Sequence, residues 1–240
     1  MKGKIIPTSD TKTSWFDGDK NTFGLLPGPK SKGGTCLCAT TEAGGCMETR
    51  KGRTLPTCYV YHIAAFRPNV LNSLAANTEL LTSCSGSERV DIFASEFQRY
   101  VESWSRYVSR NTDTVHSLPA YRIHWSGDCP DIGYVADLRI AMEFFPGMRF
   151  WGYSRAQFTI PVMRGLKNCM WYLSVDDVTM EPSREFIRLI ARDTQVSLAY
   201  MGKEKHEGFE QCGSDTVGHK GACKQCQKCL RGEPVWFPRR

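Results

Sequence analysis

Hydrophobic and polar positions along the chain follow two periods, one typical of helices and one typical of strands. The clearest helical pattern spans 87–109, with Ser87 as its expected cap. A second helical pattern follows the helix-start signal Arg-Pro-Asn at 67–69. Residues 1–35 are polar and rich in Gly, Pro, Ser and Thr, which predicts an extended lead-in with one short strand at most.

From residue 121 onward, short apolar runs alternate with helical patterns. Strands are predicted at 121–125, 148–153, 170–175 and 196–200, and helices at 134–145, 160–167 and 182–191. Strand–helix–strand spacing of this kind requires crossover connections, hence a parallel sheet covered by helices. The predicted fold class is α/β, either a partial (β/α) barrel or an open parallel sheet with a cysteine-rich N-terminal loop and C-terminal extension. The predicted parts are the lead-in 1–35, an α/β domain 36–205 and a metal-binding extension 206–240.

The composition of the 240 residues is that of a globular protein, with 41% hydrophobic and 23% charged residues, so wholesale disorder is excluded. No apolar run approaches the roughly 18–20 residues of a membrane helix, and the N-terminus lacks the apolar stretch of a secretory signal. We therefore expect a cytoplasmic protein without a membrane partner. The net charge of +6 permits a nucleic-acid partner, and ordinary surface charge is the alternative. The Lys and Arg residues at 2–4, 30–32, 50–53 and 220–240 lie mostly near the cysteines of the chain, so nucleic-acid contact there is one interpretation.

The unusual feature of the composition is its 11 cysteines. Because reducing cytosol disfavours disulfides, clustered cysteines there indicate a metal site or catalysis. One cluster lies near the start of the chain and comprises Cys36, Cys38, Cys46 and Cys58. The other lies near the end and comprises Cys212, Cys223, Cys226 and Cys229. The isolated ones are Cys84, Cys129 and Cys169.

The spacing of the C-terminal cluster predicts a metal centre. Cys-x2-Cys-x2-Cys with one remote cysteine suits an iron–sulfur cluster of the 4Fe-4S type. Four thiolates also suit structural zinc, where His219 is a possible replacement for one thiolate. The N-terminal cluster is looser, and the glycines around it let the backbone wrap around a centre. The eight cysteines serve either one shared centre or two.

Polar side chains follow the predicted strands at their carboxyl ends, where α/β folds carry their sites. The candidate catalytic residues are His124, Ser126, Asp128, Tyr153 and Asp176, and the candidate substrate-binding residues are Arg155, Ser174 and Tyr200. His124 or Asp128 would move protons or orient a substrate, and Arg155 would receive a phosphate or carboxylate. The structural alternatives are a hydrogen-bonded core histidine for His124 and turn or helix capping for Asp128 and Asp176.

Two stretches resemble the phage gene product 88 family: Arg-Ile-His-Trp-Ser-Gly-Asp at 122–128 and Phe-Trp-Gly-Tyr-Ser-Arg at 150–155. The early Cys-Tyr at 58–59 and the late cysteines with two-residue spacing extend the resemblance over roughly residues 20–230. The family looks like a distant relative of radical S-adenosylmethionine barrels, which implies an iron–sulfur protein with a partial barrel and S-adenosylmethionine as a further candidate cofactor. Cys129 stands where the family has Phe, and the Cys-x3-Cys-x2-Cys loop of typical radical enzymes is absent from the sequence.

Two functions are consistent with these patterns. The first is a phage-type iron–sulfur enzyme, radical-type or nucleic-acid-modifying, with a polar pocket at the strand ends beside the cluster. The second is a non-catalytic factor in phage replication or host takeover, which binds nucleic acid or protein and whose zinc or iron–sulfur centres only hold irregular segments together. Under either hypothesis we expect the protein in the cytoplasm of a bacterial host.

Overall fold

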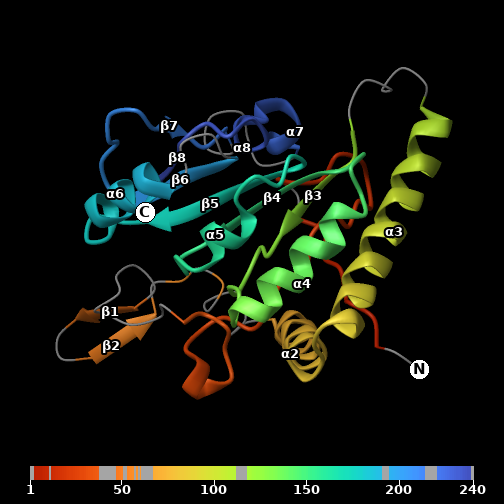
Figure 1. Cartoon of the computed structure of the whole chain (residues 1–240), viewed down its shortest axis with the longest axis horizontal. Coiled ribbons are helices and arrows are strands. Elements are labelled where there is room, and N and C mark those ends of the chain that lie inside the picture. Colours follow the sequence, from red (N-terminus) through yellow and green to blue (C-terminus); the bar gives the residue numbers. More distant parts are fainter. Residues whose placement is uncertain are drawn as a thin grey trace.

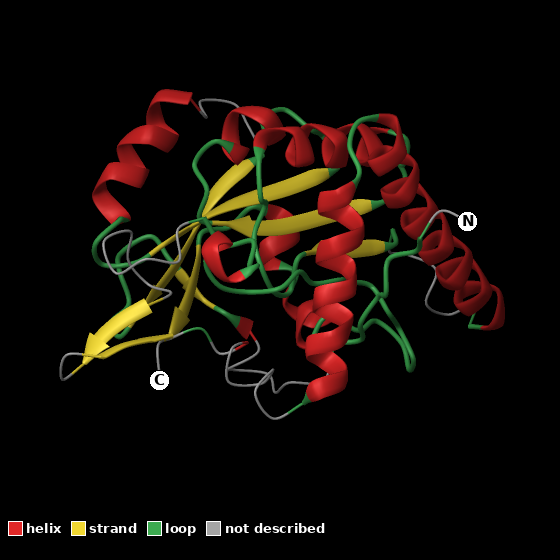
Figure 2. Cartoon of the chain, turned by 90° about the horizontal axis from the view of Figure 1, so that it is seen from below, coloured by secondary structure: helices red, strands yellow, loops and turns green. Residues whose placement is uncertain are grey.

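The computed structural model describes residues 3–10, 12–37, 47–50, 53–56, 58, 60, 67–111, 118–190, 195–213 and 221–238. Its centre is a sheet of six strands in the order β3-β4-β5-β6-β8-β7, and every neighbouring pair is parallel. The strands splay apart, so that the sheet curls into an open half-barrel (Figure 2). The prediction of an α/β fold with a partial parallel barrel is confirmed.

The elements have the following bounds. The strands of the sheet are β3 (Ala120–Ile123), β4 (Arg149–Ser154), β5 (Cys169–Val175), β6 (Val196–Gly202), β7 (Glu210–Gln211) and β8 (Val235–Pro238). A separate antiparallel hairpin is formed by β1 (Met47–Arg50) and β2 (Arg53–Pro56). The helices are η1 (Lys30–Lys32), α2 (Pro68–Ser83), α3 (Ser87–Arg110), α4 (Ile132–Glu143), α5 (Thr159–Met163), α6 (Met180–Ile190), α7 (Ala222–Cys226) and α8 (Lys228–Arg231).

Alternate residues of each strand face opposite sides of the sheet, and the two sides differ in what covers them. On β5, Trp171 and Leu173 belong to the main core, which α3 and α4 complete with a set of buried aromatic rings. The intervening Tyr172 packs on the other side, with Val235 of β8 and with cysteines of the C-terminal segment. Figure 1 shows α3, α4 and α5 along one side of the strands and the short α7 and α8 on the opposite side.

The helices and strands predicted from 67 to 200 are confirmed, although their ends differ by a few residues; the helix predicted at 160–167, for example, ends at Met163. Two corrections depend on a residue with positive φ. Ser87 is the first residue of α3 and not its cap, because Gly86 takes the cap position with a φ of 57° that glycine tolerates. The first sheet strand ends at Ile123 and not at Trp125, because His124 turns the chain with a φ of 50°. Both corrections concern backbone conformations with positive φ, which no hydrophobic pattern encodes.

The C-terminal segment is part of the sheet. Its strand β8 pairs with β6 along Ala199 to Gly202, and β7 pairs with β8. The segment predicted as a cysteine-rich extension therefore supplies two of the six strands, which the short apolar run at 235–238 alone did not indicate.

The lead-in is fixed to the rest of the chain by backbone hydrogen bonds. Residues 21–25 run beside β3, where Arg122 N donates to Asn21 O and Leu25 N donates to Ser126 O. On α2, the buried Asn77 accepts a hydrogen bond from Ile6 N at 2.7 Å and donates to the carbonyls of Ile6 and Gly24. One side chain thus satisfies three backbone groups of the lead-in.

Within the described residues, no helix is both long and apolar enough to cross a bilayer.

Asn77→Ala removes these three hydrogen bonds and leaves buried backbone groups without their partner. We expect it to lower the free energy of unfolding by about 2–4 kcal/mol, at about 1 kcal/mol for each bond plus the cost of unsatisfied groups. Urea unfolding followed by circular dichroism measures the change. Asn72→Ala, at an exposed position of the same helix, is the matched control and should change stability by less than about 0.5 kcal/mol. Equal effects of the two substitutions would contradict this role of Asn77.

Candidate functional site

The four C-terminal cysteines line one small cavity of about 20 Å³. Cys212 follows β7, Cys223 and Cys226 belong to α7, and Cys229 belongs to α8. The rest of the wall is mainly apolar and includes Trp151, Leu230 and Val235.

Two backbone features bring these cysteines around the cavity. Gln227, with a φ of 51°, ends α7 and starts α8, so that the chain turns between Cys226 and Cys229. Gly213 packs directly on Cys226, where a Cβ atom at position 213 would lie 2.7 Å from the sulfur. A side chain at position 213 would therefore push against the thiol.

Burial and mutual repulsion keep the thiols of Cys223 and Cys229 in the protonated form. Burial raises the pKa of Cys223 to about 12, and the neighbouring charges of Cys229 and Cys212 add to the increase. Burial likewise raises the pKa of Cys229 to about 12, although the hydrogen bond from Tyr153 opposes it. None of the four forms a disulfide with another described residue. A cation between the sulfurs would reverse these effects, because it stabilises the thiolate.

The thiols surround the cavity without meeting at a single point. Within the described part of the chain, no group of three or more His, Cys, Asp or Glu side chains is arranged to hold a metal ion. For all four sulfurs to coordinate one ion, they would have to move closer together. Four thiols on one cavity are a donor set that fits a thiolate metal centre. In this structure, however, the sulfurs are not arranged as the ligands of one ion.

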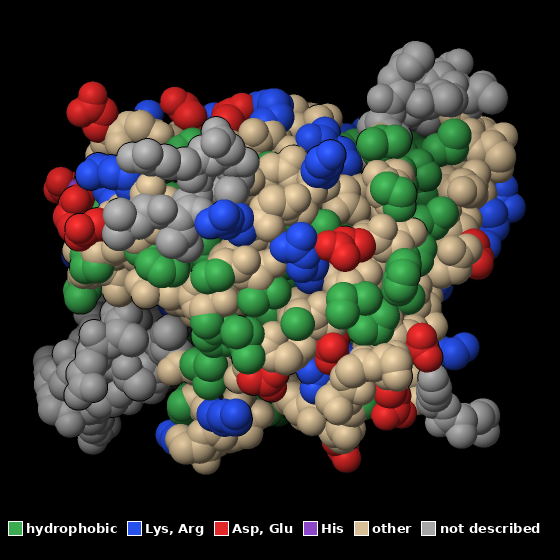
Figure 3. Space-filling view, viewed as in Figure 1, with side chains coloured by type: hydrophobic (Ala, Val, Ile, Leu, Met, Phe, Trp, Pro, Cys, Tyr) green, Lys and Arg blue, Asp and Glu red, His purple; other side chains and the backbone are tan. Residues whose placement is uncertain are grey.

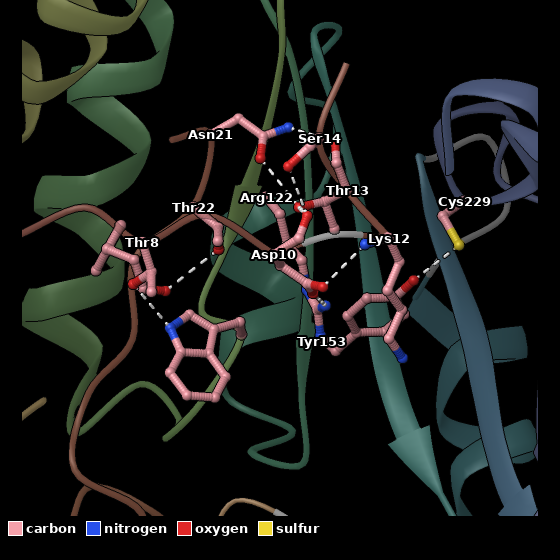
Figure 4. A network of polar contacts seen from close by, with 12 residues as sticks. Thr8, Asp10, Lys12, Thr13, Ser14, Asn21, Thr22, Arg122, Tyr153 and Cys229 are labelled. Carbon is pink, nitrogen blue, oxygen red and sulfur yellow. Dashed lines mark hydrogen bonds and ion pairs between the residues drawn. The ribbon is translucent and has the colours of Figure 1, made fainter. Parts of the chain in front are cut away.

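A polar network joins the cavity to the lead-in and to the sheet (Figure 4). Tyr153 of β4 donates its hydroxyl proton to Cys229 Sγ at 2.8 Å. The guanidinium of Arg122 lies over the Tyr153 ring, 5.5 Å from its centroid, and pairs with Asp10 at 3.3 Å. Cys223 N donates to the carbonyl of Lys12 at 2.9 Å. The first and last segments of the chain therefore meet at the cysteines.

The second polar site lies at the carboxyl ends of β3 and β4, and its centre is Asp128. This buried carboxylate accepts hydrogen bonds from Ser154 Oγ at 2.6 Å, Cys129 N at 2.7 Å and Arg155 N at 2.9 Å. Burial raises its pKa, and these three donors act in the opposite direction. The backbone N–H of Asp128 in turn donates to Thr35 Oγ1. The residue directly before Cys36, the first of the N-terminal cysteines, thus lies at this edge of the sheet.

Asp176 and Asp177 diverge, as expected for chain neighbours. Asp176 pairs with the Arg155 guanidinium at 2.9 Å and accepts hydrogen bonds from the start of the next turn at Thr179. Burial opposes its ionisation, but Arg155 and Thr179 outweigh burial and lower its pKa. Asp177 is exposed and accepts the hydroxyl proton of Tyr200. Asp128, Arg155 and Asp176 therefore form one chain of contacts along the rim of the sheet.

His124 lies apart from this rim, in the aromatic core. Its Nε2 is 2.7 Å from the Tyr134 hydroxyl, and its ring meets Phe23 edge to face. Burial lowers the pKa of His124 to about 3, so the ring is neutral at physiological pH. Cys129 Sγ lies 4.0 Å from Nδ1 and is fully buried. This is the environment of a hydrogen-bonded core histidine.

The remaining candidates are dispersed. Ser126 is buried and donates its hydroxyl proton to the Leu25 carbonyl. Ser174 lies partly buried on β5, opposite Ala199 in the register. Of the N-terminal cysteines, Cys38 and Cys46 lie outside the described residues, and neither Cys36 nor Cys58 lines the cavity of the C-terminal cluster. His219 also lies outside the described residues.

The structure thus divides the predicted site residues into a thiol cavity, a rim chain and a core histidine. Tyr153 contacts a cysteine of the cavity and not the rim, because it faces the opposite side of the sheet from Ser154. Sequence reasoning missed Asp10 and Arg122, which adjoin the cavity. Arg122 stands in the 122–128 motif, where its alternation with Ile123 was the available signal.

Comparison with known proteins gives the family of the chain. The Gene 88 protein of Mycobacterium phage L5 is 24% identical over 229 residues, which cover 90% of this chain and 84% of the phage protein. The Gene 88 protein of Mycobacterium phage D29 is 24% identical over 230 residues, with 90% and 85% coverage. No solved structure matches. Residues 4–232 match the family described as gene product 88, so the chain belongs to the phage gene product 88 family, as its motifs predict.

Proposed function

We propose that the protein is a metal-binding phage protein in which Cys212, Cys223, Cys226 and Cys229 hold one metal centre. The observation that supports this is the convergence of four thiols from three short elements on one cavity with apolar walls. When bound, the metal would supply the cation that the four thiolates require and would cross-link β7, α7 and α8. In structural sites of this kind, metal binding contributes directly to folding stability.

The position of the cluster supports a stabilising role. The short helices α7 and α8 cover this side of the sheet, and the buried apolar side chains of these two helices are Ala222 and Leu230. A metal cross-link compensates for a small apolar interface, as in other small metal-bound segments. The protein thereby corresponds to the hypothesis in which metal holds irregular segments together.

Two metals suit four thiols, and different observations favour each. The cavity of about 20 Å³ accommodates a guest the size of one water molecule, which favours a single zinc ion. The Cys-x2-Cys-x2-Cys spacing and the hydrogen bond from Tyr153 to a sulfur are features that accompany iron–sulfur clusters. We favour zinc and retain the iron–sulfur cluster as the second candidate, which a brown colour of anaerobically purified protein would identify.

We assign a structural role to the rim chain of Asp128, Arg155 and Asp176, which positions the ends of the strands. Each polar atom of the Asp128 carboxylate already has a partner within the chain, and these partners join the ends of β3 and β4. Catalysis by His124, Ser126, Asp128, Tyr153 or Asp176 stays a prediction from the sequence.

Cys226→Ser removes one ligand of the proposed centre. We expect anaerobically purified wild-type protein to carry metal in a fixed ratio to the chain and the variant to lose most of it, as measured by elemental analysis for zinc and iron together with sulfide. Cys84→Ser is the matched control, because Cys84 lies in the main core and its thiol donates to Leu80 O, which a serine can also do. Wild-type protein without metal, or a Cys226→Ser variant with unchanged metal, would contradict the proposal.

Tyr153→Phe removes the hydrogen bond to Cys229 Sγ while keeping the ring. Loss of such a partner of a metal ligand costs about 10–100-fold in metal affinity, which competition with a chelator measures. Tyr172→Phe is the control, because the Tyr172 hydroxyl donates to backbone carbonyls of Cys229 and Glu233 and not to a sulfur. If both variants release metal equally, the hydrogen bond to sulfur has no special role.

Asp128→Asn replaces one carboxylate oxygen by an NH2 group, which cannot accept a hydrogen bond. The oxygen that is lost is either the acceptor of Arg155 N or the acceptor of Ser154 Oγ and Cys129 N. We expect the free energy of unfolding to fall by about 1–3 kcal/mol, because one buried donor loses its acceptor, while the metal content stays at the wild-type ratio. Asp177→Asn, at the exposed neighbouring rim position, should change stability by less than about 0.5 kcal/mol. Loss of metal from Asp128→Asn would show that the rim and the metal centre are one site.

A further inference from the structure

The amino ends of the strands carry an open cleft of about 560 Å³ that the metal centre does not use. Its walls come from the end of α4, the turn between α5 and β5, and the residues that precede β3 and β4. The buried side chains of Met148 and Leu166 contribute an apolar floor. This region is distinct from the carboxyl ends of the strands, where sequence reasoning placed the site.

Positive charge dominates this basic cleft. Arg139, Arg149 and Lys167 line it, and the single carboxylate among the lining residues is Glu143. That carboxylate is already compensated, because Arg139 Nε pairs with it at 2.8 Å. Lys167 is exposed, and no described residue accepts a hydrogen bond from its ammonium group. The cleft thus presents an excess of cationic side chains to a ligand.

The cationic groups are held in place before any ligand binds. Arg139 also donates to the carbonyl of Arg164 at 2.9 Å and to that of Val162. Arg149 donates to the Leu230 carbonyl at 2.8 Å. Because backbone carbonyls fix both guanidinium groups, binding an anion costs little side-chain entropy.

Apolar side chains lie beside the cleft. On the outer face of α4, Ile140 is 44% exposed and Phe144, which follows Glu143, is 64% exposed. Hydrophobic side chains form a band over α3 and α4 on the face shown in Figure 3, with Lys and Arg near the middle of that face. Cations next to an exposed aromatic ring are the combination that binds single strands, since phosphates meet the cations and bases stack on the ring.

We propose that the basic cleft binds single-stranded nucleic acid, with backbone phosphates at Arg139, Arg149 and Lys167 and a base against Phe144. A flexible strand can enter a concave cleft, whereas a rigid duplex carries its phosphates on a convex surface. The inference does not rest on the proposed metal centre, although the carbonyl that holds Arg149 belongs to Leu230 of α8, the residue next to Cys229.

The test measures fluorescence anisotropy of a labelled single-stranded oligonucleotide of about 12 nucleotides, a length within the usual site sizes, with the full chain as purified. Lys167→Glu should weaken binding about tenfold and reduce the slope of log affinity against log salt by about 0.7, the value for one phosphate contact. Lys203→Glu makes the same charge change at an exposed position beyond the carboxyl end of β6 and should leave affinity within about twofold. Phe144→Ala keeps the charge and should weaken binding about fivefold or more through lost stacking.

Several results would overturn the inference. These are no binding by the wild-type chain at low salt, equal weakening by Lys167→Glu and Lys203→Glu, or a duplex that binds more tightly than the single strand. Polyglutamate that competes as well as an unlabelled strand would indicate an acidic protein partner, and a mononucleotide that competes equally would indicate a small ligand. Thermal unfolding of each variant distinguishes a lost contact from a lost fold.

Discussion

A parallel sheet must be covered on both of its faces, and this constraint organises the whole molecule. One face is covered in the usual way by α3, α4, α5 and α6, with aromatic rings in the core. On the other face, the only long helix that contributes among the described residues is α3, through Trp104 in its second half. This face is covered by the lead-in, which brings Trp15 onto Trp104 and Trp151, and by α7 and α8, which bring Leu230 and the cysteines. The cysteines of the C-terminal segment are therefore part of what covers the second face of the sheet.

The two ends of the chain solve this problem jointly. The lead-in is fixed by Asn77 of α2 and by pairing beside β3, and it then offers the Lys12 and Trp15 carbonyls to the C-terminal segment. The C-terminal segment in turn pairs with β6 and places Cys229 against Tyr153. Polar contacts, pairing and thiols replace the apolar interface that a covering helix would have provided.

Much of the fold was predictable from the sequence, because the α/β part alternates apolar strand runs with helical periods from 121 to 200. The parallel sheet followed from this alternation. The helices α2 and α3 followed from the separate helical patterns after 67–69 and at 87–109. The strands β7 and β8 did not, since they are short and stand among polar residues and cysteines. For the site, the grouping of the C-terminal cysteines was predictable from spacing. The separation of His124 from Asp128 was not, because it depends on the positive φ of His124, which turns its ring into the core. The basic cleft had no local signal, since its cations come from three separate elements: α4, the start of β4 and the turn before β5.

The pairing of β6 with β8 has a consequence for the order in which the protein forms. The strand β8, which is the partner of β6, is separated from the end of β6 by the 32 residues 203–234. During synthesis, the sheet from β3 to β6 therefore emerges from the ribosome before β8 can join it, and β6 is an open edge in that interval. Open edges and late, long-range contacts make a nascent chain prone to aggregation and dependent on chaperones. Pairing of β8 with β6 therefore closes the exposed edge of the sheet.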